Sequence, residues 1–351
     1  MTTANSLARR FLGSQETGLV IVVMLLVIAL TALAGSHADR LTGATVNNFL
    51  NSNTLIQIAT DASFFAIMAI GATIVIISGG IDLSVGSIYA LAGVIMGLAL
   101  RALGAAGTPA IVLVGLVTCI GVGLLCGVLN GLLVVGLRVH PFIITLGTMW
   151  VLRGIAFVTT KAESILVPFQ LTSVTKASLG LHGGLYPVPM LAMIAVTVVG
   201  WLYLTRTVMG RHIFAFGGNI EASRFAGLAL GRIQLGVFAV SGLTAGLAAF
   251  LGASFYGSVS SGDGQGYELY VIASAVVGGA SLIGGKGSAI GATLGAVLIV
   301  LIRQSIRTLH FDQNYEWIVI GCAIIVAVVV DRWSAGVTAR RLSRSAGASS
   351  P

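Results

Sequence analysis

The stretch VVGGASLIGGKGSAIG, residues 276–291, has the composition of a phosphate-binding loop, because glycines surround a single lysine. A Walker-type loop has the pattern G-x-x-x-x-G-K-[ST], in which backbone amides and the lysine hold the phosphates of a nucleotide. Here Ala280 stands where the first glycine is required, and Gly287 follows Lys286 where a hydroxyl residue is required. The segment also joins two apolar runs rather than a strand and a helix. We therefore expect no ATP here and interpret the stretch as a glycine-rich turn.

Three polar residues in apolar surroundings are candidates for handling a solute: Asp82, Ser84 and Asn130. An aspartate inside a membrane span is unfavourable by about 3 kcal/mol on insertion scales, so it usually has a function. The alternative for Asp82 is a position at the water interface, where it caps the following helix. Asn130 lies deeper in its run, where its amide can bond to a neighbouring helix or line a polar path. We predict that these three residues belong to a translocation pathway for a hydroxylated solute.

Clusters for enzyme chemistry or metal binding are absent from the sequence. Neither G-x-S-x-G nor H-E-x-x-H occurs, and the five histidines are scattered. The three cysteines lie inside apolar runs and form no CxxC pair; they are Cys119, Cys126 and Cys322. We expect no enzymatic activity, no metal and no cofactor in this chain.

The elements that must position these residues are membrane helices. Of the 351 residues 56% are hydrophobic and only 9% are charged, whereas a soluble domain carries about 25% charged residues. A bilayer core about 30 Å thick requires about 20 apolar residues per helix. The sequence thus predicts an all-α polytopic membrane protein with a single transmembrane domain, residues 1–351. Its ten expected spans are 17–34, 56–78, 87–104, 110–136, 142–160, 188–206, 234–256, 267–283, 289–308 and 315–332.

The distribution of basic residues predicts the orientation. With the N-terminus inside the cell, 12 of the 19 Lys and Arg residues fall in cytoplasmic segments, as the positive-inside rule requires. The net charge of +8 therefore indicates membrane topology, and we expect no nucleic-acid partner. The cytoplasmic segments are 1–16, the loop 207–233 and the tail 333–351. The first apolar run ends like a signal peptide at Ala32-Leu33-Ala34, but an uncleaved first span is the preferred interpretation.

Small residues recur at four-residue spacing in three of the expected spans. The stripes are Gly123, Gly127 and Gly131; Gly242 and Gly246; and Gly287, Gly291 and Gly295. Such stripes allow helix backbones to touch, and we expect contacts within one subunit rather than a dedicated dimer face. Two glycine-rich breaks between apolar runs also share a sequence pattern. In each, a Gly-Gly pair is followed by Gly-Ser, at residues 79–87 and 278–288. They indicate either a weak internal repeat, as in many transporters, or two convergent helix caps.

The loop 207–233 contains a short predicted helix. Asn219 is a suitable N-cap, Glu221 lies in the first turn, and Gly227 ends the helix after about two turns. The segment is either an ordinary connector or, with Phe225 exposed, a helix that docks into the groove of a partner.

With these features, the chain resembles the inner-membrane permease subunits of bacterial ATP-binding-cassette importers, specifically the ribose, xylose and galactose type. The matching stretches are SGGIDLSVGSIYALAGVIM at 78–96, Asn130-Gly131, HPFIITLGTMWVLRGIAFVTT at 140–160, and residues 210–227 and 266–295. The similarity covers nearly the whole chain, and five motifs in the right order are more specific than any one of them.

The resemblance implies the partners. Two permease subunits, identical or related, pair in the inner membrane and open alternately to its two sides. Two cytoplasmic ATPase subunits bind the ATP and Mg²⁺, and a periplasmic sugar-binding protein delivers the solute. The segment Glu221-Ala222-Ser223 with Gly227 is similar to the E-A-A-x-x-x-G coupling motif of the family, with Ser223 as a small-for-small departure that preserves a close contact with the ATPase. The residues expected to couple are Gly217, Gly218, Asn219, Glu221, Ala222, Ser223, Arg224 and Gly227.

The sequence is therefore interpreted as a non-enzymatic permease subunit for a pentose or hexose, driven by ATP-gated alternating access. Arg303 and Arg307, near the outer helix ends, are expected to contact acidic patches on the binding protein. One alternative is a permease for a branched-chain amino acid, a nucleoside or a signalling sugar. The other is a stand-alone secondary transporter, which more often carries an ion-binding carboxylate at mid-membrane.

Overall fold

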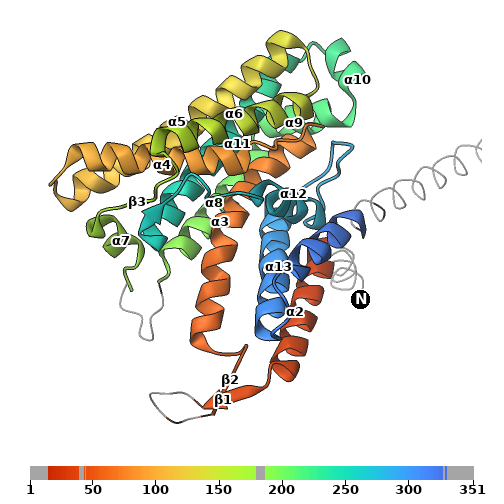
Figure 1. Cartoon of the computed structure of the whole chain (residues 1–351). Helices are drawn as coiled ribbons and strands as arrows, with labels where there is room; N and C mark the ends of the chain where they lie inside the picture. The colour runs from red at the N-terminus through yellow and green to blue at the C-terminus, as the bar shows by residue number, and fades with distance from the viewer. Residues whose placement is uncertain (1–14, 39–42, 44, 179–185, 327–328, 330–351) are drawn as a thin grey trace, which may run out of the picture.

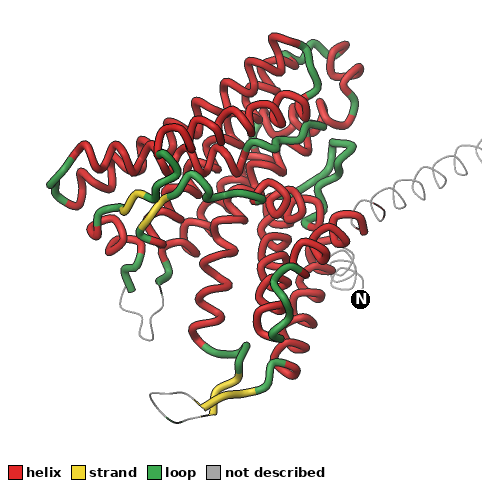
Figure 2. The backbone as a smooth tube through the Cα atoms, in the orientation of Figure 1, coloured by secondary structure: helices red, strands yellow, loops and turns green. Residues whose placement is uncertain are grey.

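The computed structural model describes residues 15–38, 43, 45–178, 186–326 and 329, and these are folded mainly into helices (Figures 1 and 2). Eight of the described helices are long and apolar enough to cross a membrane. They are α2 (Gln15–Leu33), α3 (Ser52–Ile77), α4 (Val85–Leu103), α5 (Thr108–Leu137), α6 (Pro141–Thr160), α8 (Val188–Arg206), α11 (Leu230–Tyr256) and α13 (Ala289–Thr308). Two shorter apolar helices are α12 (Tyr267–Val277) and the helix Tyr315–Val326.

The predicted all-α polytopic architecture is confirmed, with two small sheets added to it. The N-terminal segment up to residue 14 and the predicted tail 333–351 lie outside the described residues. The remaining helices of the described ranges are α7 (Phe169–Thr175), α9 (Val208–Gly218) and α10 (Ile220–Phe225). The antiparallel strand pairs are β1 (Ser36–Ala38) with β2 (Thr45–Asn47), and β3 (Ile165–Leu166) with β4 (Ser258–Val259). The second pair ties the segment after α6 to the segment after α11.

α3 forms the centre of the molecule. It is apolar on every side and buried along most of its length, as expected for a helix in the core of a large protein. It packs against α8, α11, α12 and α13. Figure 1 shows α2, α3 and α13 side by side, while α4, α5 and α6 are steeply inclined to them. Only a minority of the residues of α5, α6 and α8 are buried, and their exposed apolar side chains require lipid or another protein as cover.

Glycine stripes hold α5 and α11 in backbone contact. A β-carbon added to Gly242 would lie 2.1 Å from the carbonyl oxygen of Gly123, and one added to Gly127 would lie 2.3 Å from the carbonyl oxygen of Phe238. The same holds for α13, where a β-carbon on Gly295 would lie 2.0 Å from the carbonyl oxygen of Ser274 in α12. The prediction that these stripes pack within one subunit is confirmed.

The Gly242→Ala variant is expected to lower the melting temperature of the purified protein by several degrees, because overpacking typically costs about 1–3 kcal/mol. The matched control is Gly121→Ala in α5, where an added β-carbon meets nothing within 4 Å. Thermal unfolding in detergent, followed by tryptophan fluorescence, measures both. Equal melting temperatures for the two variants would contradict the contact.

The two glycine-rich breaks end their helices in the same way. After α3, Gly79 has a φ of +82°, and after α12, Gly279 has a φ of +97°. In each case the residue after this glycine donates its amide to the carbonyl five positions back, Gly80 to Val75 and Ala280 to Ala275. This positive-φ cap is a standard helix terminator. The breaks therefore share one cap geometry, which agrees with either of the predicted explanations.

The expected full span at 267–283 is wrong, because α12 ends at Val277. The apolar residues after it belong to the turn that follows, so counting apolar residues overestimated the helix. Eleven residues rise about 16 Å at 1.5 Å per residue, which is half of a bilayer core about 30 Å thick. α12 is therefore a half-helix that cannot span the membrane alone.

Candidate functional site

The three polar residues predicted for the pathway lie together in one buried cluster. Asp82, 1% exposed, lies in the segment between α3 and α4. Its Oδ1 accepts hydrogen bonds from the Ser84 amide at 2.9 Å and the Ser84 hydroxyl at 2.6 Å. Asn130 on α5 donates its side-chain amide to the Ser84 hydroxyl at 2.7 Å. Ser241 on α11, which the sequence did not single out, donates to Asp82 Oδ2 at 2.8 Å.

This cluster links α5 and α11 to the break between α3 and α4. Within the described part of the chain Asp82 forms no ion pair, so hydroxyl and amide groups alone solvate its carboxylate. Buried polar groups of this kind are stable only while their hydrogen bonds are made. In this conformation the cluster is closed to solvent, and its role in a pathway stays a prediction.

The Asp82→Leu variant is expected to reduce stability, because the hydroxyls of Ser84 and Ser241 lose their acceptor. Each unsatisfied buried group costs about 1–3 kcal/mol. Asp82→Asn, which keeps an acceptor oxygen, is expected to retain most of the stability. Melting temperature and solute uptake are measured for both variants. A melting temperature unchanged in Asp82→Leu would contradict a structural role, and uptake unchanged in a folded Asp82→Asn would contradict a role in the pathway.

The predicted short helix in the loop 207–233 is confirmed as α10. Asn219 is its N-cap, and its side-chain oxygen accepts from the Ala222 amide at 2.9 Å. The chain leaves the helix at Gly227, where φ is +76°. Glu221 and Arg224 are both exposed and lie 3.8 Å apart. Phe225 is 86% exposed, so α10 presents an aromatic ring and two charges to its surroundings.

The residues expected to couple the permease to the ATPase differ in their exposure. Gly218, Asn219, Glu221, Ala222, Arg224 and Gly227 are exposed. Ser223, in contrast, is 4% exposed: its own chain covers it in this conformation, and its contact with an ATPase stays a prediction.

Gly217 connects α9 to both helix breaks. A β-carbon on it would lie 1.7 Å from the carbonyl oxygen of Ile77 and 2.9 Å from the amide nitrogen of Gly285. That amide in turn donates to the Ile77 carbonyl at 2.8 Å. The end of α9 therefore lies directly on the end of α3 and on the turn between α12 and α13.

Arg303 has a different environment from the one expected of a docking residue. Its Nε lies 2.5 Å from Glu316 Oε1, and its side chain is 19% exposed. The guanidinium also lies over the rings of Tyr270 and Phe65, 4.8 Å and 5.4 Å from their centroids. These groups surround Arg303 within its own chain, and its contact with the binding protein stays a prediction. Arg307 is exposed and is the better-placed candidate.

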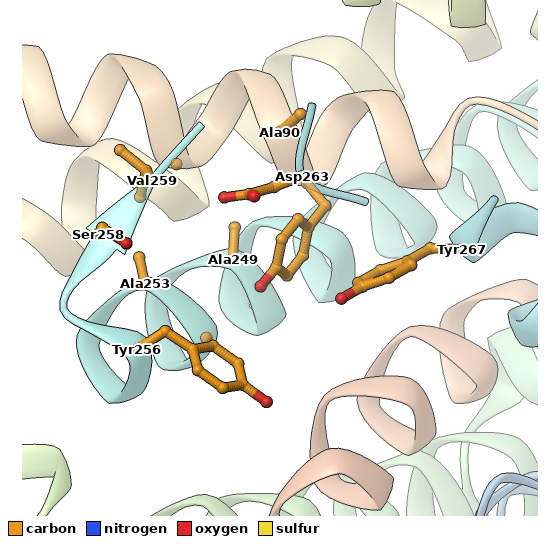
Figure 3. A pocket seen from close by; sticks show the side chains of 11 residues that line it. Ala90, Ala249, Ala253, Tyr256, Ser258, Val259, Asp263 and Tyr267 are labelled. Atoms are coloured by element: carbon orange, nitrogen blue, oxygen red, sulfur yellow. The ribbon is translucent and has the colours of Figure 1, made fainter. Parts of the chain in front are cut away.

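A small polar cavity lies between α4, α11 and the segment that precedes α12 (Figure 3). Its volume is about 100 Å³, enough for a few water molecules at about 30 Å³ each. Asp263, Tyr256 and Tyr267 line it together with Tyr89, and the hydroxyl of Tyr256 donates to Asp61 at 2.6 Å. The cavity beside the non-helical segment that precedes α12 is thus lined by carboxylate, hydroxyl and aromatic groups. No group of His, Cys, Asp or Glu residues in the described ranges could hold a metal ion.

Comparison with known proteins gives consistent matches along the chain. The profile of the family described as "Branched-chain amino acid transport system / permease component" matches residues 54–328. The ribose import permease protein RbsC of Haemophilus influenzae is 34% identical over 333 residues, which cover 94% of this chain and 97% of the relative. The corresponding protein of Escherichia coli K12 is 35% identical and covers 81% and 87%. The D-allose transport system permease protein AlsC of the same strain is 36% identical and covers 81% and 85%.

Proposed function

Because this chain belongs to the family of branched-chain amino acid transport system permease components, we propose that it is the permease subunit of a bacterial ATP-binding-cassette importer for a monosaccharide. The observation that carries the proposal is the similarity to ribose and allose permeases over 81–94% of the chain. The described helices that are long enough to span a membrane, together with the importer relatives, support a multi-pass location in the inner membrane. The chain is a transport subunit rather than an enzyme.

The partners follow from this role. A second permease subunit, identical or related, pairs with this chain, which forms one transmembrane domain. A cytoplasmic ATPase holds the ATP and Mg²⁺, and a periplasmic protein delivers the sugar. Both termini of the permease lie in the cytoplasm, on the side of α10. The exposed ring of Phe225 and the capped end of α10 support docking into a groove on the ATPase, since short helices with apolar anchors bind in this way.

A route for coupling begins at α9. ATP-driven closure of the ATPase moves α10, and with it the end of α9. Since Gly217 touches both Ile77 and Gly285, this movement reaches the break after α3 and the turn before α13 together. The Asp82 cluster lies directly after the break at the end of α3. We therefore expect its hydrogen bonds to open and re-form when the subunit opens to the other side of the membrane.

Arg307 is proposed to contact the binding protein. Arg307→Glu is expected to weaken binding-protein association about tenfold at low salt, because electrostatic complementarity mainly governs association and is screened by ions. Arg101→Glu, at the outer end of α4, is the matched control. Affinity measured by biolayer interferometry at 20 and 300 mM NaCl tests this. Equal affinities of Arg307→Glu and wild type at low salt would remove Arg307 from the interface.

The experiment for the function is uptake by proteoliposomes that contain this chain together with its ATPase and its binding protein. We expect ATP-dependent uptake of D-ribose, D-allose or D-fructose, the last because the fructose import permease protein FrcC of Rhizobium meliloti is also similar, at 31% identity. The family description names branched-chain amino acids, so L-leucine is the competing substrate. Uptake of L-leucine without uptake of any sugar would establish a permease for branched-chain amino acids instead.

A further inference from the structure

A second pocket with polar side chains lies on the side of α6 that carries the exposed Trp150 and Phe157. It is separate from the Asp82 cluster. Its volume is about 190 Å³. It is lined by Ser87, Met149, Trp150, Arg153, Phe157, Gln265 and Glu268. The segment between α11 and α12 separates this pocket from the cavity of Figure 3, because Asp263 and Tyr267 face that cavity while Gln265 and Glu268 face the pocket.

The pocket lies beside the middle of α6. Arg153 is near the centre of α6 (Pro141–Thr160). Glu268 is at the start of the half-helix α12, and its Oε2 would lie 2.7 Å from a β-carbon placed on Gly86, at the start of α4. The starts of α4 and of the half-helix α12 thus meet beside the middle of α6. Interrupted helices at this depth are a common feature of solute sites in transporters.

Arg153 holds the irregular backbone beside the pocket. One terminal nitrogen donates to the carbonyl of Ser261 at 2.9 Å and also to the carbonyl of Asp263. Arg153 and Glu268, which carry opposite charges, line the same pocket. Non-helical backbone is tolerated at membrane depth only where protein or water satisfies it. Arg153 is therefore a positioning residue, which keeps the segment with Gln265 in place.

Polar groups remain available in the pocket. The hydroxyl of Ser87 is fully buried, yet it has no hydrogen-bond partner among the described residues. Gln265 is exposed, and its neighbour across the pocket, Trp150, is 69% exposed. A carboxylate and an amide at this depth do not face lipid hydrocarbon; they face protein or a water-filled passage.

We propose that this pocket binds the monosaccharide as it crosses the membrane, an inference that rests on the proposed function. Glu268, Gln265 and Ser87 would bond to sugar hydroxyls, and the rings of Trp150 and Phe157 would pack on the apolar face of the sugar. A few polar groups among aromatic ones are typical of small-molecule sites. The opposite charges of Arg153 and Glu268 balance, which suits a neutral solute. The second permease subunit covers the open side.

The first test uses Glu268→Gln and Gln265→Ala in the complete reconstituted complex. The probe is whichever of radiolabelled D-ribose, D-allose and D-fructose the wild type takes up. We expect uptake to fall about tenfold at low sugar concentration, while complex assembly and basal ATP hydrolysis stay within twofold of wild type. The matched controls are Glu163→Gln and Gln170→Ala, exposed positions after α6 and in α7, which should transport normally. Wild-type uptake in both pocket variants would overturn the proposal.

The second test remains informative if a pocket variant assembles poorly. Gln265→Cys is made in a Cys322→Ser background, since Cys119 and Cys126 are buried. A water-soluble, positively charged methanethiosulfonate reagent is expected to modify it, and the transported sugar to slow the reaction at least threefold. No modification, or modification that the sugar leaves unchanged, would overturn the proposal. A wild type that transports no sugar would instead refute the proposed function.

Discussion

The Gly217→Ala variant is expected to lose at least nine-tenths of ATP-driven uptake while the membrane helices remain folded. The added β-carbon would lie 1.7 Å from the Ile77 carbonyl oxygen, so α9 must move away from the end of α3. That movement separates α9 from the turn at Gly285 as well. Since α10 and its exposed ring are unchanged, the ATPase should still bind, and ATP hydrolysis should become independent of the sugar-loaded binding protein.

The neighbouring glycine provides the control. A β-carbon on Gly218 meets nothing within 4 Å, so Gly218→Ala should transport at the wild-type rate. Uptake by proteoliposomes and ATPase stimulation are measured on the same preparations. Wild-type uptake in Gly217→Ala would show that the contact between α9 and the two breaks does not transmit the ATPase movement.

The Phe225→Ala variant is expected to reduce the affinity of the permease for its ATPase about tenfold. An aromatic anchor in a desolvated groove commonly contributes more than 1 kcal/mol to binding, and 1.4 kcal/mol corresponds to a factor of ten. Glu221→Ala should act in the same direction by removing one exposed charge of the motif. The amount of ATPase that co-purifies, titrated against its concentration, measures the effect.

Phe169→Ala is the matched control for Phe225→Ala. Phe169 is 79% exposed, and it lies in α7, at the end of the molecule away from α10 (Figure 1). Its removal therefore changes exposed aromatic area by a similar amount without touching the proposed docking helix. If Phe225→Ala and Glu221→Ala both keep full ATPase binding and stimulated hydrolysis, α10 is a connector rather than a coupling element.

Local rules predicted the elements whose signals lie close together in the sequence. Asn219, Glu221 and Gly227 lie within nine residues, and cap chemistry alone placed α10 correctly. The stripe containing Gly123 and Gly127 likewise predicted a backbone contact, because four-residue spacing places small residues on one helix face. The partner of that stripe, α11, was not predicted, because Gly291 and Gly295 in α13 have the same spacing as Gly242 and Gly246 but pack against the end of α12.

Long-range arrangement was harder to predict. Asp82, Ser84 and Asn130 were selected for polarity in apolar surroundings, but the contribution of Ser241 depends on where α11 packs. Arg303 was placed on the outer surface by its position in the chain, whereas Glu316 and Tyr270, brought by neighbouring helices, enclose it. No spacing rule links residues on different helices.

The polar pocket on α6 was missed for a related reason. The count of apolar residues assigned a full span to 267–283, which put Glu268 at a membrane interface where a charge needs no explanation. Because α12 ends at Val277, it is a half-helix, and Glu268 in its first turn shares a pocket with Trp150 and Arg153 near the middle of α6. The signal that the sequence did contain was Arg153 within an apolar span, since a cation there requires a partner.

The most direct test of the central claim is sugar uptake by proteoliposomes assembled from purified components. We predict that D-ribose, D-allose or D-fructose accumulates only when this chain, its ATPase, its binding protein and ATP with Mg²⁺ are all present. Omission of any one of them should reduce uptake to the level of empty vesicles. Uptake by the permease alone, driven by an ion gradient and unchanged by ATP, would contradict the account.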